Sequence, residues 1–135
     1  MIVILAILCA FALPLFADLG RDARLANLEG AAGSVRSAAA IAHSAWLARS
    51  EPDNPLILEG GVEVTMSEEG YPTRNAEGIG AAAQLDDNDF TFGAFGGGGP
   101  NRTVEIGLTD GPDSCLFKYN PSNGTVSGLE SADCQ

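Results

Sequence analysis

The sequence predicts an α+β domain in which one long N-terminal helix packs on a small antiparallel sheet. Two observations lead to this fold class. An uncharged apolar run at residues 1–17 continues into a stretch of helical periodicity that ends near residue 50. After it, short runs that alternate apolar and polar residues are separated by glycine- and proline-rich turns. We expect a helix of roughly fifty residues followed by a sheet of about three to five strands.

The first segment, residues 1–17, has three possible interpretations. A signal peptide needs a basic region before the apolar run, which is absent, and Leu15 is a poor residue at the third position before a cut after Ala17. A core helix normally shows a polar face, and this run has none. A membrane anchor fits best, because a spanning helix needs about 17–25 residues. Pro14 removes a backbone hydrogen bond, so we expect a kink or local unwinding near Leu13.

The second segment, residues 18–50, is amphipathic. Its large and small apolar residues recur at spacings of three and four, which places them on one helix face. These predicted helix–sheet packing residues are Leu25, Leu28, Ala32, Val35, Ala39, Ala42 and Trp46. Asp22, Glu29 and Arg36 lie on the opposite side. Gly20, Gly30 and Gly33 weaken the helix by about 1 kcal/mol each and allow another helix to approach closely. The first two segments can therefore form one continuous helix.

The third segment, residues 51–135, is the predicted head. Residues 50–61 contain two prolines and are expected to form a loop. The predicted strands are Val62–Met66, Val104–Leu108 and Cys115–Tyr119, with 90–95 as a fourth candidate. Residues 121–124 (Pro-Ser-Asn-Gly) predict a turn that leads into Thr125 and Val126, and the four glycines at 96–99 predict a flexible loop.

Charge and cysteine content limit the function classes. Residues 1–50 hold four arginines and three acids, whereas residues 51–135 hold three basic residues and fifteen acids. So acidic a head repels phosphate backbones, and no nucleic-acid partner is expected for it. Cys115 and Cys134 are the two cysteines of this half, apart from Cys9 in the apolar run. A bridge between them is our hypothesis; it would stabilise the head by about 3 kcal/mol and would require an oxidising compartment.

Neither catalysis nor a cofactor is expected. His43 is the one histidine, and no acid or nucleophile is spaced to act with it. Asp86, Asp87 and Asp89 bring together carboxylates of the kind that calcium prefers, but the glycine and terminal glutamate of a calcium loop are missing. A solvated acidic turn is the preferred interpretation. The sequons at Asn101 and Asn123 are short matches that predict little.

Three stretches together resemble the type IV pilin family, and pilins of the mannose-sensitive haemagglutinin type in particular. The run Ala-Phe-Ala-Leu-Pro14-Leu-Phe, followed by residues 17–25, is similar to the lower part of the pilin helix. Gly70-Tyr-Pro-Thr-Arg with Gly78-Ile79 is similar to a segment that follows the first strand in those pilins. Cys115 and Cys134 resemble the pair that closes a disulfide loop in many pilin heads.

The resemblance implies a structural subunit and not an enzyme. Such a subunit waits in the bacterial inner membrane, and the pilus assembly machinery then adds it to an extracellular helical filament of identical copies that serves adhesion or surface attachment. The residues expected in the membrane and then in the filament core are Ile2, Val3, Ile4, Leu5, Ile7, Leu8, Phe11, Leu13, Pro14 and Phe16. Pilins carry a basic leader, a glycine cut site, an aromatic first residue and a glutamate, none of which precedes Met1. We therefore expect the sequence to begin inside the helix, at an internal methionine taken as the start.

Two alternatives remain open at this point. A pseudopilin of a type II secretion system shares the helix and acts as a periplasmic piston, although such heads are commonly stabilised by calcium and not by a disulfide. A membrane-anchored periplasmic module that never polymerises is the other alternative.

Overall fold

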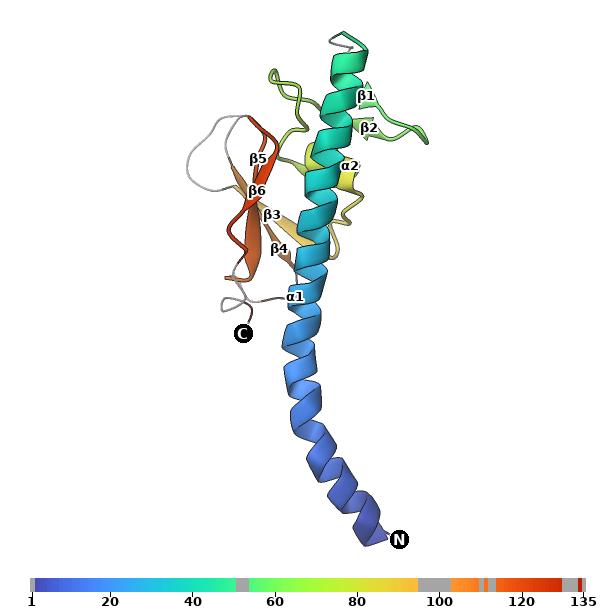
Figure 1. Ribbon diagram of the computed structural model, residues 1–135, viewed down its shortest axis with the longest axis vertical. Coiled ribbons are helices and arrows are strands. Elements are labelled where there is room, and N and C mark those ends of the chain that lie inside the picture. The colour runs from blue at the N-terminus through green and yellow to red at the C-terminus, as the bar shows by residue number, and fades with distance from the viewer. Residues whose placement is uncertain are drawn as a thin grey trace.

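The computed structural model describes residues 2–50, 54–94, 103–109, 111, 114–129 and 134, with the side chains of residues 8–19 and of residue 94 outside the description. Helix α1 (Ile2–Ala48) is followed by a head of short strands and turns. Figure 1 shows the head lying along the second half of α1, while the first half extends well beyond it. The predicted α+β class, with a long helix packed on an antiparallel sheet, is confirmed.

The main sheet has four antiparallel strands in the order β3-β4-β5-β6. They are β3 (Phe90–Ala94), β4 (Val104–Leu108), β5 (Leu116–Asn120) and β6 (Thr125–Ser127). The register places Ile106 opposite both Phe92 and Phe117. The predicted turn at residues 121–124 joins β5 to β6, and Gly124 has the positive φ of 68° that favours glycine. The glycine run at 96–99 lies outside the described residues.

The chain segment between α1 and the main sheet, residues 54–89, forms a second, smaller group of elements. Strands β1 (Leu56–Ile57) and β2 (Glu63–Val64) pair antiparallel, and the π-helix η1 (Ala76–Gly80) continues into α2 (Ala81–Ala83). The prediction of a loop over 50–61 was therefore wrong at β1, where Leu56 is buried. Only residues 63–64 of the predicted strand 62–66 form a strand, and Met66 makes an isolated bridge with Pro72.

One face of α1 forms the core with the inner face of the main sheet. The helix contacts β4, β5 and β6. Its buried residues in this core are Leu28, Ala31, Ala32, Val35 and Ala39, and the sheet contributes Val104, Ile106, Phe117 and Tyr119. Burying a large apolar side chain stabilises by about 1.5–3 kcal/mol, whereas the alanines of the helix mainly let the sheet approach closely. The core therefore combines small helix residues with large strand residues.

A second apolar cluster secures the end of α1 that is farthest from the N-terminus. It contains Ala42, Leu56, Val64 and Met66, with Trp46 packed against it and half-buried. Asn54 supports this region, because its side-chain amide donates to the Met66 carbonyl and its oxygen accepts from the Met66 N–H. The small layer β1–β2 thus attaches to α1 independently of the main sheet.

The C-terminal region is fastened by a disulfide between Cys115 and Cys134, which confirms the hypothesis from the sequence. Both residues are buried in the main core. Because Cys115 immediately precedes β5, the bridge holds the last described residue against the sheet.

Helix α1 continues through Pro14 without a break. The local unwinding that we expected near Leu13 is absent, and Figure 1 shows instead that the helix curves over its N-terminal part. Curvature of this kind accommodates a proline whose missing N–H leaves one carbonyl without its helical partner.

We expect Val35→Asp to destabilise the head severely, because it places a carboxylate where the native side chain has no exposed surface. The expected loss is more than about 3 kcal/mol in the free energy of unfolding, measured by urea denaturation of the full chain in a mild detergent. Ser37→Asp, an exposed change two residues further along the same helix, is the matched control and should stay within about 0.5 kcal/mol. Equal stability of the two variants would contradict the observed buried face.

The double variant Cys115→Ser/Cys134→Ser should lose about 3 kcal/mol of stability, since the bridge closes a chain segment with a separation of 19 residues. Urea unfolding of the variant and of the native protein tests this. Mass spectrometry after alkylation without reductant should find neither thiol free in the native protein isolated from its source cells. Free thiols at both positions would show that the bridge does not form in the cell.

Candidate functional site

The N-terminal end of α1, residues 2–7, presents large apolar side chains to solvent. Ile2, Val3, Ile4, Leu5 and Ile7 are each between 53% and 83% exposed. An exposed run of this kind on a folded protein marks an interaction surface, because leaving apolar area in water is unfavourable. We call residues 2–7 the exposed helix end. The side chains of the other residues predicted for the filament core are outside the description; these residues are Leu8, Phe11, Leu13, Pro14 and Phe16.

Among the residues that the structure describes, no helix reaches both the length and the mean hydropathy required of a membrane span.

The predicted packing face of α1 is found where the head covers the helix. Leu28, Ala32, Val35, Ala39 and Ala42 are buried, and Leu25 and Trp46 are partly buried and packed against the two clusters. Asp22, Glu29 and Arg36, predicted on the opposite side, are exposed.

His43 takes part in a stack of rings at the far end of the helix. Its ring lies 4.1 Å from that of Tyr71 with an angle of 3° between the planes, and 6.2 Å from that of Trp46. The Nδ1 atom lies 2.8 Å from the Gly70 carbonyl oxygen. A carbonyl accepts only, so Nδ1 carries the proton in this contact. This arrangement ties the loop around residue 70 to α1, which is a structural role that the sequence did not reveal.

In the acidic turn at residues 86–89, one carboxylate accepts hydrogen bonds from another residue of the same turn. Asp86 Oδ1 accepts from the backbone N–H and from the side-chain amide of Asn88. Asp86, Asp87 and Asp89 are all exposed, and the described part of the chain contains no group of three or more histidine, cysteine or acidic side chains arranged to hold a metal ion. Asp86 and Asp87 line a hollow of about 640 Å³ together with Glu63 and Glu77, which makes this surface unfavourable for anionic ligands.

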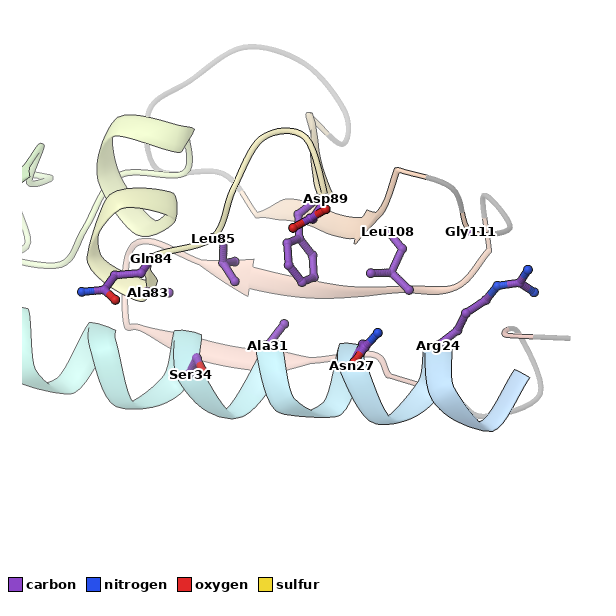
Figure 2. A pocket seen from close by; sticks show the side chains of 11 residues that line it. Arg24, Asn27, Ala31, Ser34, Ala83, Gln84, Leu85, Asp89, Leu108 and Gly111 are labelled. Atoms are coloured by element: carbon purple, nitrogen blue, oxygen red, sulfur yellow. The ribbon is translucent and has the colours of Figure 1, made fainter. Parts of the chain in front are cut away.

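A cavity of about 590 Å³ lies between α1 and the edge of the main sheet. Figure 2 shows Arg24, Asn27, Ala31 and Ser34 on the helix side and Leu85, Asp89 and Leu108 on the opposite side. Ala31, Leu85 and Leu108 provide apolar wall, whereas Arg24 and Asp89 provide charges of opposite sign. No pattern in the sequence pointed to this cavity, because its walls come from two distant segments, residues 24–34 and residues 83–111.

Tyr119 is a buried polar side chain that links the main sheet to the loop at residue 72. Its hydroxyl donates to the Pro72 carbonyl oxygen at 2.8 Å, and its ring is fully buried. Burial, with a further contribution from the neighbouring Tyr71, raises the pKa of Tyr119 well above its usual range. The hydroxyl is therefore a stable donor over the physiological pH range.

In comparisons with known proteins, no protein-family model, no curated protein and no solved structure matches the chain.

Tyr119→Phe should lower the free energy of unfolding by about 1–3 kcal/mol at neutral pH, because the Pro72 carbonyl then loses its donor. The raised pKa also predicts a pH dependence. The contribution of Tyr119 is complete below its unfolded-state pKa of about 10 and is lost as the pH rises further, since the unfolded state then ionises first. Urea unfolding at neutral pH and above pH 10 tests both effects, with Tyr71→Phe as the control that keeps both rings. An unchanged stability of Tyr119→Phe at neutral pH would contradict this role.

Proposed function

We propose that the protein is a type IV pilin-class subunit, which waits in the bacterial inner membrane and polymerises through α1 into an extracellular filament for adhesion or surface attachment. The observation that carries this proposal is the division of α1 into two halves. One half is packed on an antiparallel sheet that carries a disulfide, and the other half extends from the head and ends in the exposed apolar side chains of residues 2–7.

An exposed apolar helix needs an apolar environment. In the proposed mechanism lipid provides it before assembly, and the helices of neighbouring subunits provide it afterwards. Each Leu or Ile newly buried between helices stabilises the filament by about 1.5–3 kcal/mol. Once the subunit has left the lipid, the five large residues of the exposed helix end would otherwise face water, so their burial between helices opposes dissociation of the filament. The uncharged sequence of residues 1–17 supports the same mechanism.

The head has features that suit a long life outside the cell. Cys115 and Cys134 form a buried bridge, which supports export to an oxidising compartment. The same bridge favours a pilin over a secretion pseudopilin, because pseudopilin heads are commonly stabilised by calcium instead. In the acidic turn, Asp86 Oδ1 already accepts hydrogen bonds from Asn88.

The test is to look for filaments of the native chain on the surface of its source bacterium. We expect the protein in the fraction sheared from cells, and gold-labelled antibody against the head should decorate thin filaments in electron micrographs. Ile4→Asp should abolish the filaments while leaving the head folded, because it places a charge in the exposed helix end. Ser37→Asp adds the same charge to an exposed position beside the head and is the matched control, which should still assemble.

Other outcomes distinguish the alternatives. A chain that stays in the membrane fraction, with no filaments in any sample, would indicate a non-polymerising module. Loss of protein secretion on deletion of the gene, without loss of surface filaments, would indicate a pseudopilin. Normal filaments formed by Ile4→Asp would contradict assembly through the exposed helix end.

A further inference from the structure

The turn between β5 and β6 contains an exposed sequon, the pattern Asn-X-Thr that accepts N-linked sugars on the surface of secreted proteins. It consists of Asn123, Gly124 and Thr125. As a sequence pattern the motif carries little weight, because three residues often match by chance. In the structure, Asn123 and Thr125 are both exposed, as an acceptor site requires, since a transferring enzyme must reach the asparagine.

The Asn123 side chain is held by the threonine of the motif. Its Oδ1 atom accepts from the Thr125 hydroxyl at 2.7 Å and from the Thr125 backbone N–H at 3.1 Å. A backbone N–H can only donate, so the amide oxygen must face Thr125 and the Nδ2 atom must point to the other side. Nδ2 donates to no residue of the described ranges. The nitrogen that would take a sugar is therefore open to a transferase.

The two hydrogen bonds to Oδ1 also favour the chemistry of transfer. An amide nitrogen is a weak nucleophile, because its lone pair is delocalised into the carbonyl group. Removing a proton from Nδ2 makes this nitrogen more nucleophilic and places negative charge on Oδ1. Donors that already point at this oxygen stabilise the charge, as the donors of an oxyanion hole do. The Thr125 hydroxyl is thus positioned to promote the reaction.

The turn is fixed to the rest of the head on its inner side. The Gly124 backbone lies so close to the Tyr71 ring that a Cβ atom on Gly124 would be 2.6 Å from it. The Gly124 N–H also donates to the Asn120 carbonyl oxygen at 2.8 Å. The other two residues of the motif are therefore presented to solvent from a rigid support.

We propose that Asn123 is a site of N-linked glycosylation. The donor is a glycosyl diphosphate, a sugar whose anomeric carbon carries a diphosphate leaving group. In the transfer, a base of the transferase takes a proton from Nδ2, the bond from Nδ2 to the anomeric carbon forms, and the bond from that carbon to the diphosphate oxygen breaks. The diphosphate leaves with the electron pair of the broken bond. Two donors share this chemistry, a lipid-linked oligosaccharide at the membrane and a soluble nucleotide sugar.

A sugar at this turn lies far from the part of the chain that drives the proposed assembly. A Cβ atom on Gly124 would be 3.5 Å from the side chain of Ala39 in α1. Ala39 is 32 residues beyond Ile7, which is about 48 Å along the helix at 1.5 Å per residue. Figure 1 shows the same separation, with β5 and β6 beside the second half of the helix. The modification therefore goes beyond the proposed function and does not depend on filament formation.

The first experiment looks for the sugar on the native protein. The full chain is isolated from its source cells, and its peptides are sequenced by tandem mass spectrometry under conditions that keep sugars attached. We expect at least one sugar on the side-chain nitrogen of Asn123. An unmodified Asn123 throughout the sample would overturn the proposal.

The second experiment identifies the donor. The full chain is produced in a host without such a transferase, held in mild detergent, and incubated with membranes of the source cells or with their soluble fraction and nucleotide sugars. Transfer by the membranes would assign a lipid-linked donor, and transfer by the soluble fraction would assign a nucleotide sugar. Transfer to Asn123 by neither would overturn the proposal.

Variants in the same assay test the two residues of the motif. Asn123→Gln should abolish transfer, and Thr125→Val should slow it about 100-fold or more, the usual effect of removing one donor to a developing negative charge. Thr125→Ser keeps the hydroxyl and should stay close to the native rate. Asn88→Gln changes an exposed asparagine of another turn and is the matched control, which should be modified like the native chain. Equal rates for Thr125→Val and Thr125→Ser would contradict the role of the hydroxyl and overturn the proposal.

Two further readouts keep the result specific to the sugar site. Because Asn123 and Thr125 are exposed, the variants should unfold at nearly the same urea concentration as the native chain. Filaments are scored separately on the source cells. Normal filaments with an unmodified Asn123 would overturn the glycosylation site alone, whereas a modified chain without filaments would overturn the filament subunit alone.

Discussion

The close packing of one face of α1 on the main sheet is the contact on which the rest of the molecule depends. Leu28 and Val35 are fully buried there, against Ile106 and Phe117 of the sheet. Alanines at the intervening helix positions let the two elements approach closely. Because α1 is one continuous helix, fixing its second half to the head also fixes the direction in which the first half leaves it. The exposed helix end is therefore presented by a rigid support.

Near the C-terminal end of α1, two glycines in loops that pack against the helix have backbone conformations that L-residues rarely adopt. Gly70 has a φ of 82°, and a Cβ atom there would lie 2.5 Å from the Trp46 ring. Gly124 has a φ of 68°, and its Cβ would lie 2.6 Å from the Tyr71 ring. These close approaches allow Trp46, His43 and Tyr71 to stack between α1 and the loops. An L-residue at either glycine would be strained and would also force a ring out of the stack.

The long helix and the order of the strands along the chain were predictable, because apolar periodicity is local information. Spacings of three and four residues were enough to identify Leu28, Ala32 and Val35 as buried, and alternation identified β4. Strand β1 was missed because two prolines precede it, at positions 52 and 55, and because its pairing partner is several residues away. The contact of His43 with Gly70 joins residues 27 positions apart in the sequence. The cavity lined by Arg24 and Asp89 is formed by residues 65 positions apart. Such contacts come from tertiary packing, which single-sequence patterns do not encode.

The distribution of charge decides which contacts can drive association between copies. The half of the chain that forms the head carries fifteen acids against three basic residues, so two heads of this composition repel one another. Salt screens that repulsion beyond about 8 Å at physiological ionic strength, but screening does not turn the repulsion into attraction. Residues 1–17 carry no charge, and those described at their start are apolar and exposed. In the proposed filament, the attraction between identical subunits therefore arises mainly from the apolar ends of the helices. This division of roles rests on the composition of the two halves and on the way in which α1 joins them.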